Sequence, residues 1–449
     1  MIETHAAEPD HATDLLSRLA ARTARVAVVG LGYVGLPLAL TFARRGGLSA
    51  LGIDVDPEKA RAVGEGRSYL RTVDGAAVRE AVHDGRLEAT TDFARVSACD
   101  AVVICVPTPL TREREPDLSY VERTGEAIAP HLRAGQAVVL ESTSYPGTTE
   151  EVLLPILERG SGLRAGRDFF LAFSPERENP GSGVATHVIP KIVGGYTPSC
   201  LEAALALYAS AFDRVVPVSS TRVAEMTKLL ENVFRSVNIA LVNELKILCH
   251  RMDLDVNEVI DAASTKPFGF MPFQPGPGLG GHCIPIDPFY LTWKARQFEF
   301  QTRFIELAGE VNTEMPRYVV HRTMEALDAR GRTLKGARVL VLGIAYKKDV
   351  DDMRESPAVR IIELLQERGA QVVYHDPYVP RVPRMRQHRL DMVSVPLTDE
   401  ALETADAVLI ATDHGGVDYA RVVERARLVV DTRNACRAVR VGREKIVKA

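Results

Sequence analysis

A glycine-rich loop at residues 276–293, GPGLGGHCIPIDPFYLTW, places a thiol and a carboxylate four positions apart. Cys283 stands at the entrance of a helix-like segment, where the field of the helix favours the thiolate form. We therefore predict that Cys283 is a nucleophile, with Asp287 close by. The alternative for a lone cysteine is an inert, small, buried apolar residue, and this is the role we assign to Cys99, Cys105, Cys200, Cys249 and Cys436.

A stretch without glycine or proline at residues 222–252 predicts a single helix about 45 Å long, at a rise of roughly 1.5 Å per residue. Lys228 and Asn232 are four residues apart in it and share a face, with Glu225 one turn earlier. This stripe offers a cation and an amide to a reaction centre. Stripes of this kind are more often solvated surfaces, so the helix alone does not decide between the two roles.

The pattern GLGYVG at residues 30–35 follows an apolar run and opens a helix-like segment. Glycines permit a tight turn and let backbone N–H groups approach a pyrophosphate, while an acid after the next strand binds ribose hydroxyls. Asp54 is that acid. It favours NAD over NADP, an inference that the nearby Lys59 weakens. The alternative, tight helix packing without a ligand, fits this context poorly, and the predicted cofactor residues are Gly30, Gly32, Tyr33, Val34, Gly35, Asp54 and Lys59.

Short apolar runs alternate with segments of helical period, which is typical of a parallel sheet with crossover helices. Two series occur, with runs at 25–29, 51–54, 101–106 and 137–141 and again at 338–342, 371–374, 407–412 and 428–431. They echo each other, since RVAVVGLG at residue 25 recurs as RVLVLGIA at residue 338. We predict an α/β fold of two Rossmann-like doubly wound domains, joined by the long central helix and a small helical domain.

The chain of 449 residues is 46% hydrophobic and 25% charged, with a formal charge of −4. This balance is typical of a soluble protein of several domains and predicts no general affinity for nucleic acid or anionic membranes. No apolar run approaches the roughly 20 residues that span a bilayer, and no signal peptide is evident, so we expect a cytoplasmic protein. The cysteines are scattered without a C-x-x-C pattern, which favours reduced thiols and no metal site.

Seven motifs in a fixed order carry a resemblance to a known family. They are GLGYVGLPLA, VPTP at residue 106, ESTSYPGTT at 141, FSPERENPG at 173, EMTKLLENVFRSVNIALVNEL at 225, PGPGLGGHCIPIDP at 275 and GIAYKKDVDDMRESPA at 343. Over residue 25 to about residue 437, the chain resembles the UDP-glucose/GDP-mannose dehydrogenase family. Several ordered motifs of this length do not coincide by chance.

The resemblance implies a four-electron oxidation at one site with two NAD⁺. Cys283 matches the family's nucleophile, which captures the aldehyde formed from the sugar's C6 alcohol as a thiohemiacetal. A second hydride transfer gives a thioester, and water hydrolyses it to a uronic acid. Lys228 and Asn232 match residues that stabilise the developing oxyanion, a role that suits a cation and an amide donor.

Further roles follow from the same resemblance. Asp287, with Thr143, matches a carboxylate that positions a water for base chemistry, and Glu176 matches a second carboxylate that acts as a base or binds substrate. The division of labour between the two acids stays open. The implied substrate contacts are Glu176, Arg177, Lys228, Asn232, Tyr346, Lys347 and Arg433, and Thr108 and Arg354 are implied for NAD. For each basic residue the alternative is a solvated surface charge.

The sequences of two segments indicate which sugar is the substrate. SPERENPG and PFGFMPFQPGPGLGGHCIPIDPFYLTW resemble the UDP-N-acetylglucosamine 6-dehydrogenase branch more closely than the UDP-glucose enzymes. Gln274, where an aromatic residue is common, and GSGVATHVIPKIVGG at residue 181 are local departures. UDP-glucose and UDP-N-acetylmannosamine are alternative substrates. A non-catalytic nucleotide-sugar or NAD-binding protein and a two-electron alcohol dehydrogenase are alternative functions, and Cys283 argues against both.

The expected domain limits follow from these motifs. Residues 1–21 are expected to form a disordered or flexible tail, 22–210 the NAD-binding domain, 211–325 the central helical domain with the cysteine loop, and 326–449 the nucleotide-sugar-binding domain. Apolar positions recur along the long helix, so we expect a homodimer that uses it. The alternative is an internal core helix in a monomer.

Overall fold

The computed structural model describes residues 11–449 apart from 112, 179–182, 282–283, 384–387 and 389. The chain divides into two compact units, Met1–Glu231 and Asn232–Ala449, and each is described by itself. The finer domain limits expected at residues 21, 210 and 325 stay a prediction.

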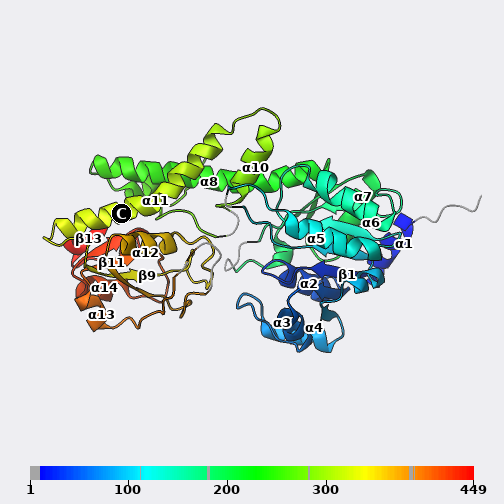
Figure 1. The fold of residues 1–449 in the computed structure, drawn as a ribbon, viewed down its shortest axis with the longest axis horizontal. Helices are drawn as coiled ribbons and strands as arrows, with labels where there is room; N and C mark the ends of the chain where they lie inside the picture. Colours follow the sequence, from blue (N-terminus) through cyan, green and yellow to red (C-terminus); the bar gives the residue numbers. More distant parts are fainter. Residues whose placement is uncertain (1–10, 112, 179–182, 282–283, 384–387, 389) are drawn as a thin grey trace, which may run out of the picture. The chain divides into compact units, whose positions relative to one another are not determined.

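An eight-stranded sheet in the order β3-β2-β1-β4-β5-β6-β7-β8 forms the centre of the first unit (Figure 1). Its first six strands are parallel in the order typical of dinucleotide-binding folds, whereas β7 runs antiparallel to β6. The strands are β1 (Arg25–Val29), β2 (Ser49–Ile53), β3 (Leu87–Thr90), β4 (Ala101–Ile104), β5 (Ala137–Leu140), β6 (Phe170–Phe173), β7 (Lys191–Gly195) and β8 (Val215–Val218).

Helices cover both faces of this sheet. Val26 and Val28 of β1 join one buried cluster, while Ala27 and Val29 join the cluster on the other face. The first cluster includes residues of α2 (Gly35–Arg44), α4 (Gly75–His83) and α7 (Pro198–Ala209), and the second includes residues of α5 (Ser119–Ile128) and α6 (Leu154–Ser161). The short α3 (Pro57–Gly64) contacts β3. Burial on both faces explains why the strands are continuous apolar runs.

The expected tail is wrong over its described part. Residues His11–Ala20 form α1, and Leu15 and Leu19 are only 2% and 3% exposed because they pack into the cluster that contains α7. Arg18 also pairs with Asp100, at 3.2 Å. Two leucines four residues apart are enough to anchor this helix once the sheet provides a surface, whereas residues 1–10 lie outside the described part.

The second unit contains a five-stranded parallel sheet in the order β10-β9-β11-β12-β13, the other common doubly wound order. The strands are β9 (Arg338–Leu342), β10 (Gln371–His375), β11 (Ala407–Ile410), β12 (Val429–Asp431) and β13 (Ile446–Lys448). The helices beside it are α11 (Arg303–Asp328), α12 (Pro357–Glu367), α13 (Asp399–Thr404) and α14 (Tyr419–Arg425), with α11 packed along α12 (Figure 1). The predicted α/β class with two doubly wound sheets is confirmed.

The predicted long helix is α8 (Thr221–Arg251), one residue from the expected limits at each end. It begins in the first unit and continues into the second, where α9 (Val256–Ala263) and α10 (Asp287–Arg296) follow. Among the helices that the structure describes, none has the length and hydropathy that crossing a bilayer requires.

Candidate active site

The three glycines of the GLGYVG loop have different surroundings. Gly30 has φ +93°, and a Cβ there would lie 2.5 Å from the carbonyl oxygen of Cys105. A Cβ on Gly35 would lie 1.8 Å from the carbonyl oxygen of Gly30, whereas one on Gly32 would meet no atom within 4 Å. Gly30 and Gly35 therefore allow the tight turn between β1 and α2, and Gly32 leaves the space next to its Cα free. An open, side-chain-free surface at a helix N-terminus fits a pyrophosphate.

Asp54 directly follows β2 and lies beside this loop. Its carboxylate accepts hydrogen bonds from the backbone N–H of Leu31, at 2.8 Å, and of Asp56, at 2.9 Å. Lys59 forms an ion pair with it at 3.1 Å, and the lysine side chain is 35% exposed. A ribose hydroxyl can take the place of this exposed ammonium, as expected for an acid that binds the adenosine ribose. Among the other predicted cofactor residues, Thr108 is buried and Tyr33 and Val34 are half-buried.

Glu176 and Lys228 meet in the first unit. The Lys228 ammonium donates to the Glu176 carbonyl oxygen at 2.6 Å and to its carboxylate at 3.2 Å, and Lys228 is only 5% exposed. Next to them, Arg177 pairs with Glu231 of α8 at 2.7 Å. Burial and the charge of Glu176 raise the pKa of Glu178 to about 7. Two elements distant in sequence thus form one cluster of ionisable groups.

A small cavity is lined by residues of both the cofactor loop and this cluster. Val34 at the start of α2 lines it together with Glu176 and Lys191. Lys191 forms a buried ion pair with Glu141 at 2.6 Å, and the Tyr208 hydroxyl donates to the same carboxylate. Glu141 lies in the ESTSYPGTT motif, from which no role was predicted for it, and Lys191 was not predicted at all. Their only sequence signal is a charged residue inside or next to an apolar strand.

Asn232 and Asp287 meet in the second unit. The Asn232 amide donates to the Asp287 carboxylate at 2.5 Å, and Asp287, the first residue of α10, is only 2% exposed. Cys283 lies outside the described residues, so its predicted role stays a prediction. Thr143, after β5 in the first unit, is half-buried. Beside it, the Ser144 hydroxyl is buried and has no hydrogen-bond partner among the residues that the structure describes.

The glycines that lead to Cys283 pack on the GIAYKK segment. A Cβ on Gly280 would lie 2.6 Å from the Cβ of Tyr346, and one on Gly281 would lie 2.9 Å from its ring. The Gly281 N–H also donates to the carbonyl oxygen of Arg354 at 3.0 Å. The Arg354 guanidinium is held by Asp352. Only glycine allows this close approach, which explains the paired glycines in the loop.

Cations gather along the same loop. Burial and the charge of Arg235 lower the pKa of Lys347, and burial lowers that of Arg433. A Cβ on Gly276 would lie 2.6 Å from the Arg433 guanidinium, and Lys246 donates to the Gly276 carbonyl oxygen at 3.4 Å. Positive charges placed close together in a partly buried region are suited to a diphosphate.

Comparison with known proteins identifies the family. Residues 24–212 match the NAD binding domain of the UDP-glucose/GDP-mannose dehydrogenase family, residues 222–314 match its central domain, and residues 340–438 match its UDP binding domain. The chain belongs to this family. It is therefore an NAD-dependent nucleotide-sugar dehydrogenase, and the resemblance stated from the motifs is confirmed.

Relatives in this family differ in the sugar that their names give. The chain is 38% identical to UDP-N-acetyl-D-glucosamine 6-dehydrogenase of Pseudomonas aeruginosa, over 87% of this chain and 90% of the relative. It is 37% identical to NDP-N-acetyl-D-galactosaminuronic acid dehydrogenase of Ralstonia nicotianae, over 93% and 97%. The solved structure of UDP-D-ManNAc dehydrogenase from Pyrococcus horikoshii superimposes with a TM-score of 0.85 at 35% identity, over 94% of this chain and 98% of that one.

The predicted site residues thus fall into pairs that the fold brings together. Lys228 contacts Glu176, and Asn232 contacts Asp287, although each partner is about 50 residues away in the sequence. Spacing along one helix indicated Lys228 and Asn232. The spacing from Cys283 indicated Asp287, and motif resemblance indicated Glu176. The individual catalytic roles of the four residues stay predictions.

Proposed function

We propose that this dehydrogenase oxidises the C6 alcohol of UDP-N-acetylglucosamine to the uronic acid. This choice of sugar is supported by the sequences of two segments, SPERENPG and PFGFMPFQPGPGLGGHCIPIDP, and by the similarity to the Pseudomonas aeruginosa enzyme. Gln274, which is exposed, lies in the second segment where an aromatic residue is common. This departure concerns the part of the site that would bind the acetamido group. UDP-N-acetylmannosamine is the second candidate, since a relative that acts on it covers nearly the whole chain.

The chemistry that we propose uses one thiol for two oxidations. The Cys283 thiolate adds to the C6 aldehyde, a C–S bond forms, and the oxygen takes up a proton to give a thiohemiacetal. Loss of hydride and of that proton gives a thioester, and water attacks its carbonyl carbon so that the C–S bond breaks and the thiol is released. NAD⁺, when bound, accepts the hydride in each oxidation. Lys228 and Asn232 donate hydrogen bonds to the developing oxyanion, and Glu176 or Asp287 takes the proton.

The observation that carries this proposal is the pairing of donors on α8 with carboxylates. Lys228 and Asn232 lie one helical turn apart, and each contacts an acid that is 9% exposed or less. Burying an ammonium and two carboxylates costs free energy. A protein that only binds nucleotide-sugars gains nothing from this cost. Such groups are expected where a proton and a negative charge must be handled.

The test is the number of NADH molecules formed per sugar. Purified protein is incubated with NAD⁺ and limiting amounts of UDP-glucose, UDP-N-acetylglucosamine, UDP-N-acetylmannosamine, UDP-N-acetylgalactosamine or GDP-mannose. We expect two NADH per molecule of UDP-N-acetylglucosamine and the uronic acid as product. A yield of one NADH, or a different preferred sugar, would reject the mechanism or the substrate respectively.

Two cysteine variants make the test specific. Cys283→Ala should abolish uronic acid formation, because the aldehyde is no longer captured. Cys249→Ala is the matched control, since Cys249 is buried in a small apolar cluster between α8 and α9. It should keep the yield of two NADH. Full activity of Cys283→Ala would overturn the thioester mechanism.

We also propose that the protein is a homodimer through α8. In the second unit, one side of this helix leaves Phe234, Leu241, Leu245 and Leu248 between 37% and 54% exposed, and Met252, directly after the helix, is 58% exposed. Of these residues, Leu241, Leu245 and Leu248 belong to the recurring apolar pattern of the helix, whereas Val233 of the same pattern is buried within the single chain. A stripe of this length on a soluble protein marks a contact surface, and a second copy offers an identical apolar partner.

A further inference from the structure

The second doubly wound domain repeats the start of the first. Gly343 follows β9 with φ +81°, as Gly30 follows β1 with φ +93°. Asp376 follows β10, as Asp54 follows β2, and the Ile344 N–H donates to Asp376 at 2.8 Å. In a dinucleotide-binding domain the acid at this position binds a ribose.

Asp376 is fully occupied by the protein itself. Its side chain has no exposed surface, whereas the lysine that pairs with Asp54 is partly exposed. Its two oxygens accept hydrogen bonds from the backbone N–H groups of Ile344, Ala345, Tyr378 and Val379 and contact the ring of His414 at 3.0 Å. A carboxylate has about four lone-pair sites, so these five partners leave no place for a ribose hydroxyl. This acid holds its own domain together.

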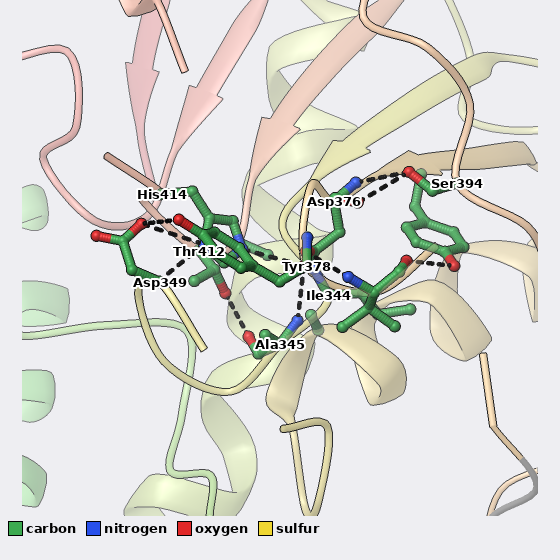
Figure 2. A network of polar contacts seen from close by, with 12 residues as sticks. Ile344, Ala345, Asp349, Asp376, Tyr378, Ser394, Thr412 and His414 are labelled. Atoms are coloured by element: carbon green, nitrogen blue, oxygen red, sulfur yellow. Dashed lines mark hydrogen bonds and ion pairs between the residues drawn. The ribbon is translucent and has the colours of Figure 1, made fainter. Parts of the chain in front are cut away.

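His414 links Asp376 to a second residue of the same domain, Asp349 (Figure 2). The backbone N–H of Asp349 donates to its Nδ1 at 3.0 Å, so the ring proton is on Nε2 and is donated to Asp376. The Tyr378 ring packs on the imidazole, with centroids 5.0 Å apart, and its hydroxyl donates to the Asp349 carboxylate at 3.3 Å. His414 is 1% exposed, so no water competes for these bonds.

The loop between β9 and α12 is therefore fixed at two places. Asp376 holds it at Ile344 and Ala345, and His414 holds it at Asp349, a residue with φ +59°. A non-glycine residue in this conformation is strained and requires such support. Tyr346 and Lys347, the predicted nucleotide-sugar contacts, lie between the two fixed points. Tyr346 also contacts the glycines that precede Cys283.

We propose that His414 is a positioning residue for the nucleotide-sugar: through Asp376 and Asp349 it holds the loop that carries Tyr346 and Lys347. This inference rests on the proposed function, because it takes the ligand of that loop to be the UDP part of the substrate. His414 itself touches no substrate. Its contribution is mainly to the affinity for UDP-sugar. The affinity for NAD⁺ should depend on it less, because the pyrophosphate loop lies in the other unit and Arg354, the NAD contact that the resemblance implies in this loop, lies outside the stretch between the two fixed points.

The test compares two replacements of His414 in the full-length protein. His414→Leu removes both the donor and the acceptor. His414→Gln keeps one of each, because a glutamine amide can accept from Asp349 and donate to Asp376. We expect the Kd for UDP, measured by calorimetry, to rise about 10-fold or more in His414→Leu, since two buried hydrogen bonds are lost, and to recover in His414→Gln. The KM for UDP-sugar should rise in parallel, with kcat and the Kd for NAD⁺ changed less.

Two more variants keep the test decisive if His414→Leu does not fold. Tyr378→Phe removes only the hydroxyl that contacts Asp349 and should weaken UDP binding about two- to five-fold. His375→Gln is the matched control, because the His375 side chain contacts the carbonyl oxygen of Val395, and only the backbone of His375, which the substitution keeps, contacts the loop at Gly343. It should bind UDP like the wild type.

Several results would overturn the inference. They are an unchanged Kd for UDP in both His414→Leu and Tyr378→Phe, an equal loss of NAD⁺ affinity, or no recovery in His414→Gln. The calorimetric measurement also separates this inference from the proposed function. If the wild-type protein binds UDP but oxidises none of the UDP-sugars, the proposed reaction fails, while the effect of His414 on UDP binding is still measured.

Discussion

Single methyl groups added to the GLGYVG loop should separate packing from cofactor binding. A Cβ on Gly35 would lie 1.8 Å from the backbone oxygen of Gly30, well inside the roughly 3.5 Å at which non-bonded heavy atoms settle. The backbone there is part of the turn and cannot move without opening it. A Cβ on Gly32 would meet nothing within 4 Å.

These distances set the expected sizes of the two effects. We expect Gly35→Ala to lower the free energy of unfolding by about 3 kcal/mol or more, because the strand-to-helix turn must shift. Gly32→Ala should change it by less than about 1 kcal/mol, since no clash arises and alanine restricts the unfolded chain. Its methyl group would, however, occupy the space of a pyrophosphate. Losing even one charge-assisted hydrogen bond costs about 1.5–3 kcal/mol, or roughly 10- to 100-fold in the Kd for NAD⁺.

Urea unfolding without cofactor gives the first quantity, and calorimetry with NAD⁺ gives the second. UDP binding is the internal control, because the UDP-binding domain is in the other unit and neither glycine belongs to it. If Gly32→Ala binds NAD⁺ like the wild type, the loop does not hold the pyrophosphate. If Gly35→Ala unfolds at the wild-type urea concentration, the role of Gly35 in closing the turn is wrong.

Burial and the charge of Arg433 lower the pKa of Lys246 from 10.5 to about 7. Between about pH 7 and 10.5, Lys246 therefore carries a proton in the unfolded chain but not in the folded one. The free energy of unfolding falls as the pH is lowered through this range, and the loss is complete below about pH 7. Lys246→Met should raise the free energy of unfolding by about 1–4 kcal/mol at pH 6.5 and by less at pH 9.5, as measured by urea unfolding; an equal gain at both would contradict this. Glu141→Gln should cost about 3–5 kcal/mol because the Lys191 ammonium stays buried without its partner, and adding Lys191→Met should recover most of that loss in thermal unfolding. Leu241→Asp with Leu245→Asp should halve the mass in light scattering, and an unchanged mass would exclude the α8 interface.

The sequence was sufficient for the elements that are buried on both faces. The runs at 25–29 and 338–342 became β1 and β9 without a change of limits. Buried parallel strands and a long helix without glycine or proline leave strong local patterns, because every neighbour of the segment is apolar or every turn is helical. The GLGYVG loop was equally predictable from the sequence, since its conformation requires glycine at particular positions.

Elements that depend on distant partners were not predictable. The helix α1 is stable only because Leu15 and Leu19 find a surface beside α7. No strand was predicted at β7, which contains the charged Lys191 and ends with two glycines. The lysine is tolerated there because its ammonium pairs with the Glu141 carboxylate and lies over the Tyr208 ring, 5.1 Å from the centroid. No local pattern of β7 contains that information.

The repeat between the two domains shows how far such patterns reach. Because RVLVLGIA echoes RVAVVGLG, the acid after the next strand is expected at Asp376, as it was found at Asp54. The same rule would then assign a ribose to Asp376, and that would be wrong, because backbone N–H groups and His414 occupy it. His414 comes 38 residues later, after β11, so only the folded sheet brings it to the acid. The position of a functional group follows from the repeat, whereas its ligand depends on which other strand ends beside it.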